Sequence, residues 1–110
     1  MGLGKTFQVC ALLTCLMRNE LIQRVLILCP VSVLHNWMRE LNDHVLPYVR
    51  RLHIDLINSD ITKQKRSRLL TDVFLSRSCR IVVSSYQLVS NMIQDFAKHG
   101  LDSFIHIYSF

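Results

Sequence analysis

The strongest constraint on the fold is an alternation of short apolar runs with stretches of helical periodicity. Residues 24–29, Arg-Val-Leu-Ile-Leu-Cys, are rich in branched apolar side chains, and Pro30 ends the run. Such a run is typical of a strand buried on both faces, as in a parallel sheet. Residues 5–19 and 31–47, which flank it, repeat their apolar side chains at helical spacing instead. The alternation predicts an α/β fold with a largely parallel sheet and flanking helices.

The second half of the chain continues this alternation. In residues 52–56 apolar and polar side chains alternate, which predicts a strand with one polar face. The remaining predicted elements are a basic helix at 61–76, a strand at 79–84, a helix at 87–98 and the start of a strand at 104–108. Parallel sheets bind ligands at the carboxyl ends of their strands, where loops gather, so functional residues are expected there.

Composition excludes several classes of protein. The chain is 50% hydrophobic and 19% charged, which is too apolar for a disordered chain. No window reaches the roughly 18 apolar residues of a membrane-spanning helix, so we expect no contact with a membrane. The cysteines include no C-x-x-C pair and the histidines share no metal-ligand spacing, which favours reduced thiols over disulfides or zinc. These residues are Cys10, Cys15, Cys29, Cys79, His35, His44, His53, His99 and His106.

The opening residues 1–6, Met-Gly-Leu-Gly-Lys-Thr, lead directly into the first predicted helix. They fit the end of the phosphate-binding loop G-x-x-x-x-G-K-[ST]. In such a loop Gly2 and Gly4 let backbone N–H groups point at an anion, and the following helix adds its partially positive N-terminus. Lys5 would then reach the β- and γ-phosphates of a nucleotide, and the Thr6 hydroxyl would bind Mg²⁺.

Two alternatives compete for the same opening residues. The first position of the loop and the strand before it are missing from the sequence, and Met1-Gly2-x-x-x-Thr6 also fits an N-myristoylation pattern. Lys5 followed by the apolar residues 7–17 also resembles a short signal peptide, although no small-residue cleavage site follows. These residues alone leave the alternatives open.

Two further motifs follow in a recognisable order. Residues 26–40 are a hydrophobic strand followed by a helical stretch, and residues 81–86 are a strand that ends in Ser-Ser-Tyr. With the opening residues, the chain resembles the first ATPase lobe of the Swi/Snf family, helicase-like double-stranded-DNA translocases that include chromatin remodellers. It looks most like the Cockayne-syndrome-B and related repair-type branch.

Three family motifs carry the resemblance. The first, D-E-M-G-L-G-K-T-x-Q, matches residues 1–8 over its last eight positions. The third, [ST]-[ST]-Y, matches residues 84–86. The second, C-P-x-x-[VL]-x-x-x-W-x-x-E, is reproduced by Cys29, Pro30, Val33, Trp37 and Glu40.

The resemblance implies a partial RecA-like P-loop lobe, with residues 1–110 forming a helicase ATP-binding domain truncated at both ends. ATP and Mg²⁺ are the implied cofactors, and Thr6 would hold the metal through the nucleotide. The implied nucleotide-binding residues are Gly2, Leu3, Gly4, Lys5, Thr6 and Gln8. The implied DNA-contacting residues are Pro30, Ser32, Asn36, Ser84, Ser85 and Tyr86.

Some of these residues have purely structural interpretations. Trp37 lies on the apolar stripe of its helix, which favours a place in the core, and Tyr86 could simply pack its ring. The net charge of +5 resides in residues 50–80, which hold eight basic and three acidic side chains. That stretch could lie over DNA phosphates and give salt-dependent affinity, although a solvated helix face is the commoner explanation. Its residues of interest are Lys63, Lys65, Arg66, Arg68, Arg77 and Arg80.

The acidic hydrolysis motif of the family, D-E-x-H, is absent. In the family its Asp holds Mg²⁺ and its Glu activates the attacking water. No carboxylate follows Asp102, so no catalytic residue is assigned and we expect no ATP turnover from this chain by itself.

The implied parent is a nuclear protein that uses ATP to track along double-stranded DNA in chromatin remodelling or DNA repair. Nucleosomes and repair or transcription proteins are its further implied partners. The alternative is a non-enzymatic binding module, either a truncated product or a small N-myristoylated protein.

Overall fold

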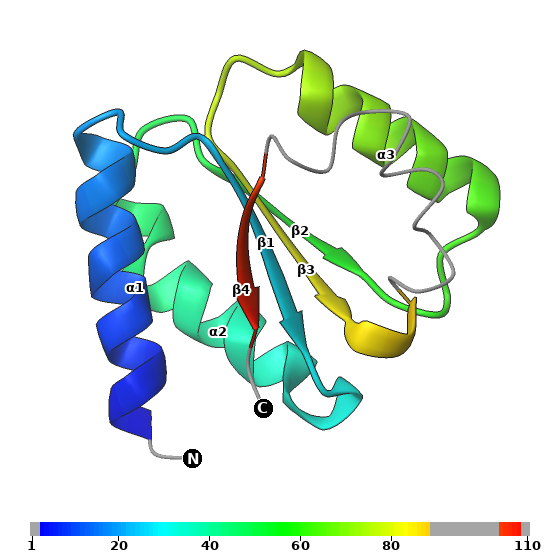
Figure 1. Ribbon diagram of the computed structural model, residues 1–110, viewed down its shortest axis with the longest axis horizontal. Helices are drawn as coiled ribbons and strands as arrows, with labels where there is room; N and C mark the ends of the chain where they lie inside the picture. The colour runs from blue at the N-terminus through cyan, green and yellow to red at the C-terminus, as the bar shows by residue number, and fades with distance from the viewer. Residues whose placement is uncertain (1–2, 89–103, 109–110) are drawn as a thin grey trace.

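Four parallel strands form the sheet in the computed structural model, which describes residues 3–88 and 104–108 (Figure 1). Their order across the sheet is β2-β3-β1-β4. The strands are β1 (Arg24–Cys29), β2 (His53–Ile57), β3 (Arg80–Ser85) and β4 (Ile105–Tyr108). The prediction of an α/β fold with a parallel sheet is confirmed.

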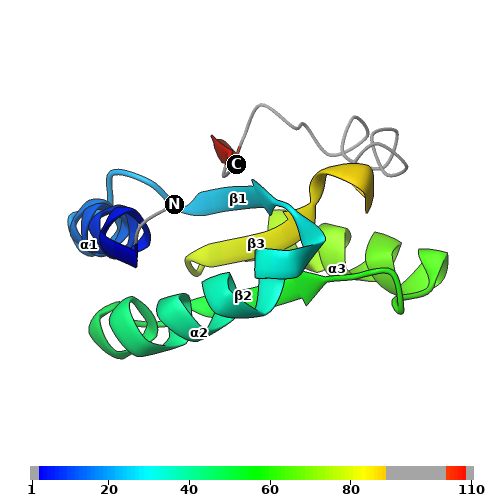
Figure 2. The same ribbon diagram turned by 90° about the horizontal axis from the view of Figure 1, so that it is seen from below.

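Helices cover both faces of this sheet. The helices are α1 (Leu3–Arg18), α2 (Leu34–His44) and α3 (Lys63–Leu75), and 3₁₀ turns occupy η1 (Val31–Val33) and η2 (Leu46–Tyr48). Figure 2 shows α1 and α2 on one side of the strands and α3 on the other. The described part of the chain is therefore a three-layer α/β/α arrangement.

The central strand β1 supplies apolar side chains to both layers. Val25 and Ile27 belong to the cluster under α1 and α2, together with the Trp37 side chain. Leu26 and Leu28 point the other way, into the cluster under α3. Full burial of one such side chain contributes about 1.5–3 kcal/mol to the stability of the fold. Strand β1 therefore stabilises the packing of the helices on both faces of the sheet. The predictions of a strand buried on both faces and of Trp37 in the core are confirmed.

Strand β2 has the predicted polar face. Leu52, Ile54 and Leu56 join the cluster under α2. His53 is exposed, and Asp55 uses its carboxylate in an ion pair with Arg80. The alternation that predicted this strand is confirmed, with the strand itself running one residue later than residues 52–56.

Element ends differ slightly from the predictions, for local reasons. The helix expected to run to Pro47 ends at His44 and continues as the turn η2, because proline disfavours α geometry in the residue before it. The basic helix begins at Lys63, where the Thr62 hydroxyl accepts a hydrogen bond from the Lys65 N–H at 3.3 Å and caps the helix. The helix expected at 87–98 and His99 lie outside the described residues, apart from a helical turn that reaches Leu88.

Two arginines lie side by side at the amino ends of the central strands, and each has its own partners. Arg80 pairs in register with Arg24. The Arg80 guanidinium, only 6% exposed, donates to Asp55 at 2.7 Å and to Asp72 at 3.0 Å. Arg24 donates instead to the Phe74 carbonyl at 3.0 Å, at the C-terminal end of α3, where a cation is favourable. Burial opposes the charge of Arg80, but the hydrogen bonds and charges of Asp55 and Asp72 outweigh it and raise the Arg80 pKa.

The described cysteines are free thiols. Within residues 3–88 and 104–108, no three His, Cys, Asp or Glu side chains come together in a way that could hold a metal ion. No helix among the described residues has the length and apolar character needed to cross a membrane.

Candidate functional site

The three sequence motifs meet at one edge of the sheet, which we call the carboxyl edge. It consists of the first turn of α1, residues 30–36 after β1, and residues 84–86 at the end of β3. Because α1 runs antiparallel to β1, its N-terminal end lies on the side toward which the arrowheads of β1 and β4 point (Figure 1). This is the edge at which parallel sheets bind ligands.

The first turn of α1 carries a positive potential. It holds no acidic residue, so nothing within it offsets the partial positive charge of the helix end. Lys5 and Gln8 are exposed, and Thr6 is only 5% exposed. Leu3 and Gly4 are part of this turn, whereas Gly2 lies outside the described residues.

An aromatic contact fixes this end of α1 against α2. The Phe7 ring lies edge-on to the His44 ring, with centroids 5.1 Å apart. The Thr14 hydroxyl also donates to the His44 carbonyl at 3.2 Å. No local sequence pattern indicates this pairing, because it joins one helix to the last residue of another.

The segment after β1 turns sharply into a helix. Pro30 is extended, and the Val33 N–H then donates to the Pro30 carbonyl at 3.0 Å to close η1. Ser32 is exposed on this turn. Asn36 is half-buried, and its side-chain oxygen accepts from Arg39 at 2.6 Å. The N–H groups at such a helix start attract anions.

Ser84 and Ser85 use their hydroxyls inside the protein. Ser84 is fully buried and donates to the Ile57 carbonyl at 3.1 Å, which ties the end of β3 to the end of β2. The Ser85 hydroxyl accepts from the Leu88 N–H at 3.2 Å and caps the turn that follows. In this arrangement the two serines position the backbone of the carboxyl edge.

Tyr86 is half-buried and packs its ring against a residue that the sequence analysis did not single out. The rings of Tyr86 and Tyr108 are stacked, with centroids 6.2 Å apart and an interplanar angle of 1°. Tyr108 ends β4, and its hydroxyl lies 3.4 Å from Nδ1 of His106. In the sequence Tyr86 closes the Ser-Ser-Tyr motif and Tyr108 lies in the strand start expected at 104–108, and no local pattern relates the two residues.

The residue types at the carboxyl edge fit a magnesium nucleotide. An exposed lysine at the positive end of a helix suits phosphate, and a threonine hydroxyl is the kind of oxygen that Mg²⁺ prefers. Cys29 at the end of β1 is not a competing soft ligand, because burial raises its pKa to about 11 and keeps the thiol protonated.

Comparison with known proteins gives one family. The SNF2-related domain matches residues 1–107 of this chain. Protein CHROMATIN REMODELING 20 of Arabidopsis thaliana is 42% identical over 73 residues, which cover 64% of this chain and 5% of that protein. DNA excision repair protein ERCC-6 of Mus musculus is 28% identical over 111 residues, covering 90% of this chain and 7% of the relative. The chain thus spans only a small share of the length of the curated relatives it matches.

Proposed function

The chain belongs to the SNF2-related domain family, as the resemblance to Swi/Snf-type ATPases predicted, and on that premise we propose that it carries the nucleotide-binding and DNA-contacting parts of an ATP-dependent double-stranded-DNA translocase. The observation that supports this most is the meeting of its three motifs at the carboxyl edge. Relatives named for chromatin remodelling and for excision repair favour a nuclear parent that acts in one of these processes.

In this proposal α1 binds the nucleotide. Lys5 neutralises phosphate charge, the helix end adds backbone N–H groups, and Thr6 holds Mg²⁺ through the nucleotide. Gly2, Leu3, Gly4 and Gln8 complete the nucleotide-binding residues, in keeping with the family motif. The bound magnesium nucleotide would supply the phosphoryl group whose hydrolysis drives movement in the parent protein.

DNA lies along the same edge in this proposal. Ser32 and the N–H groups at the start of α2 contact backbone phosphate, with Pro30 and Asn36 beside them. Because the Ser84 and Ser85 hydroxyls have partners in the protein, these serines act by positioning Tyr86 and the end of β3. Lys63, Lys65 and Arg68 are exposed on α3 and add sequence-independent attraction for the phosphates.

The nucleotide part is tested with a fluorescent ATP analogue in the presence of Mg²⁺. Lys5→Ala removes a charge-assisted contact to phosphate, so we expect its affinity to fall about tenfold or more. Lys63→Ala removes a lysine charge from the first turn of α3, on the other face of the sheet. This control should bind the ATP analogue with nearly the affinity of the unchanged chain. Equal affinities for the two variants would contradict the assignment.

The DNA part has a matched pair of variants on one helix. Asn36→Asp places a negative charge at the start of α2 and keeps the oxygen that Arg39 contacts, so duplex DNA should bind several-fold more weakly at low salt. Asn42→Asp makes the same change on the exposed surface two turns later and should have little effect. Fluorescence anisotropy of a labelled duplex measures the DNA affinity of both variants. An equal loss of affinity in the two would contradict a DNA contact at this edge.

Turnover is a separate expectation. The sequence holds no D-E-x-H motif, so we expect nucleotide binding without phosphate release from this chain by itself. A phosphate-release assay with and without duplex DNA checks this, and DNA-stimulated release from the purified chain would contradict it.

A further inference from the structure

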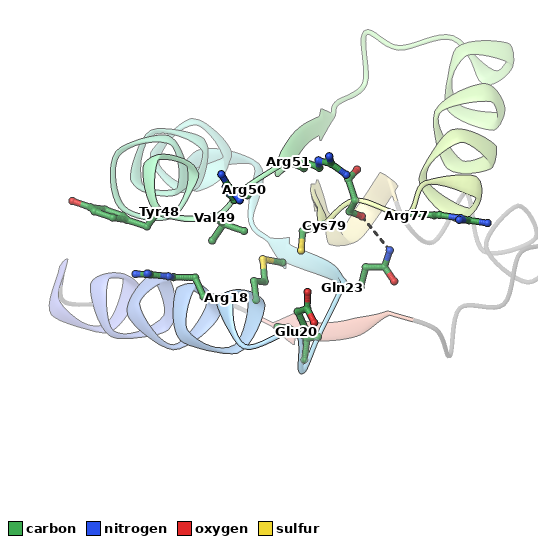
Figure 3. A pocket seen from close by; sticks show the side chains of 12 residues that line it. Arg18, Glu20, Gln23, Tyr48, Val49, Arg50, Arg51, Arg77 and Cys79 are labelled. Carbon is green, nitrogen blue, oxygen red and sulfur yellow. Dashed lines mark hydrogen bonds between the residues drawn. The ribbon is translucent and has the colours of Figure 1, made fainter.

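A large cavity opens at the opposite end of the sheet from the carboxyl edge. Its volume is about 1060 Å³, and it lies between the end of α1, the segment after η2 and the segment before β3. Arg18, Arg50, Arg51 and Arg77 line it (Figure 3). We call it the arginine cavity.

The charge of the arginine cavity is not neutralised by the part of the chain that the structure describes. Its four arginines are exposed, and none of them forms an ion pair with a residue in 3–88 or 104–108. Glu20 is the one carboxylate among the residues that line it. Unpaired charges of one sign around a recess concentrate the potential and favour a ligand of opposite sign. The planar guanidinium group suits carboxylates in particular, because it binds both oxygens at once.

The spread of these charges favours an extended ligand. In Figure 3, Arg18 and Arg77 lie toward opposite ends of the view, and Arg50 and Arg51 lie between them. The four arginines come from three separate segments, so a flexible chain with several negative charges suits them better than a single small anion. Duplex DNA carries its phosphates on the outside of a stiff rod, which suits a recess of this kind less well than a peptide does.

The arginine cavity also offers apolar contacts. Met17 and Val49 line it and are 3% and 7% exposed, so they form part of its inner wall. Tyr48 at its rim is 58% exposed. Tyrosine and arginine are the residue types that most often dominate the affinity of protein interfaces. We propose that the arginine cavity binds an extended acidic peptide segment of a protein partner.

The floor of the cavity is built to stay in place without a ligand. The Gln23 side chain donates to the carbonyls of Ser76 and Ser78, at 3.3 Å in each case, and so joins the start of β1 to the segment before β3. Leu52, directly after Arg51, is 7% exposed and anchors the opposite wall in the core. A recess held open in this way binds a peptide without a large cost of ordering the protein.

The test uses a short fluorescein-labelled peptide of alternating glutamate and leucine. The variant Arg18→Gln/Arg50→Gln/Arg77→Gln removes three charges from the cavity and leaves Arg51, which has a positive φ of 56°, unchanged. The control Lys63→Gln/Lys65→Gln/Arg68→Gln removes three exposed charges from α3. We expect the cavity variant to weaken binding about tenfold or more, and the control by less than about threefold.

Three further measurements make the result decisive. Thermal unfolding of both triple variants should match that of the unchanged chain, because the substituted side chains are exposed. A peptide with glutamine in place of glutamate should not bind, and neither duplex DNA nor inorganic phosphate should displace the acidic peptide. Equal losses in the two triple variants, binding of the glutamine peptide, or displacement by duplex DNA would each overturn the proposal.

Discussion

Strand β3 ends in two serines at the carboxyl edge of the sheet, whereas β1 and β3 each begin with an arginine at the amino edge. Ser84 and Ser85 bind backbone groups of the neighbouring segments. Arg80, at the other end of β3, binds two carboxylates, and Arg24, at the start of the neighbouring strand β1, binds a helix end. In the proposed function, the groups of the carboxyl edge that bind a ligand are therefore Lys5 and the backbone N–H groups.

The arginines near the amino edge themselves fall into two groups. Arg24 and Arg80 have partners within the fold, and Arg80 is buried. The four arginines of the cavity are exposed and have no ion-pair partner among the described residues. The comparison indicates that the two arginines within strands stabilise the fold, whereas those at a helix end or in a connecting segment keep their charge exposed.

The largest expected effect is on Arg80. Arg80→Met removes the partner of the half-buried Asp55, and breaking a buried pair of this kind costs about 3 kcal/mol of unfolding free energy. Urea denaturation of the purified variant measures the loss. Arg77→Met makes the same chemical change in the cavity and should cost less than about 0.5 kcal/mol. Similar losses of unfolding free energy in both variants would contradict the distinction between the arginines with partners in the fold and the cavity arginines.

At the carboxyl edge the corresponding variant is Ser84→Ala. The buried Ile57 carbonyl then loses a hydrogen-bond donor, which we expect to lower the unfolding free energy by about 1–2 kcal/mol. Ser32→Ala, on an exposed turn of the same edge, serves as the control in the same denaturation series and should be nearly neutral. If Ser84→Ala left stability unchanged while weakening DNA binding, the serine would be a direct DNA contact.

A smaller effect, of opposite sign, is expected at the end of α1. Glu20 has a positive φ of 59°, and the N–H groups of Glu20 and Leu21 donate to the carbonyls of Met17 and Leu16. This is the helix ending that glycine favours, so Glu20→Gly should raise the unfolding free energy by about 1 kcal/mol. Arg18→Gly, within the helix, should instead lower it by about 1 kcal/mol. Thermal unfolding compares the two, and the same sign for both would contradict this account.

The smallest expected effect is a difference in the rate of thiol labelling between two cysteines at opposite edges of the sheet. Cys29 ends β1 and is fully buried, whereas Cys79 lines the arginine cavity and is half-buried. Burial raises the pKa of both thiols, and the charge of Glu20 adds to the effect at Cys79. Labelling with a thiol reagent near pH 8, followed by mass spectrometry, should modify Cys79 several-fold faster than Cys29. The acidic peptide should slow labelling of Cys79 alone, and faster labelling of Cys29 would contradict the placement of the cavity.

Local patterns in the sequence were enough to predict the layers of this fold. Residues 24–29 were predicted as a buried strand because branched apolar side chains end at a proline, and β1 has these bounds. The placement of Ser32 and Tyr86 directly after the carboxyl ends of β1 and β3 follows from the order of strands and helices, and parallel sheets gather such residues at one edge.

Features that depend on strand register or on contacts between distant segments could not be predicted from the sequence. The bond from Ser84 to the Ile57 carbonyl requires the alignment of β2 with β3, and no local pattern encodes it. The basic stretch from 50 to 80 was recognised as one region, but the fold divides it between α3, the buried Arg80 and the arginine cavity. Arg18, from outside that stretch, joins the cavity because α1 ends beside it.

The position of β1 between β3 and β4 also governs how this chain acquires its structure. Arg24 pairs with Arg80 and Val25 with Ile105, so β1 pairs with the two described strands that lie furthest from it in the sequence. Pairings so distant in sequence close large loops and therefore form slowly. Until they form, the apolar side chains of β1 have no neighbouring strand, so residues 24–29 are a segment that chaperones would shield during synthesis.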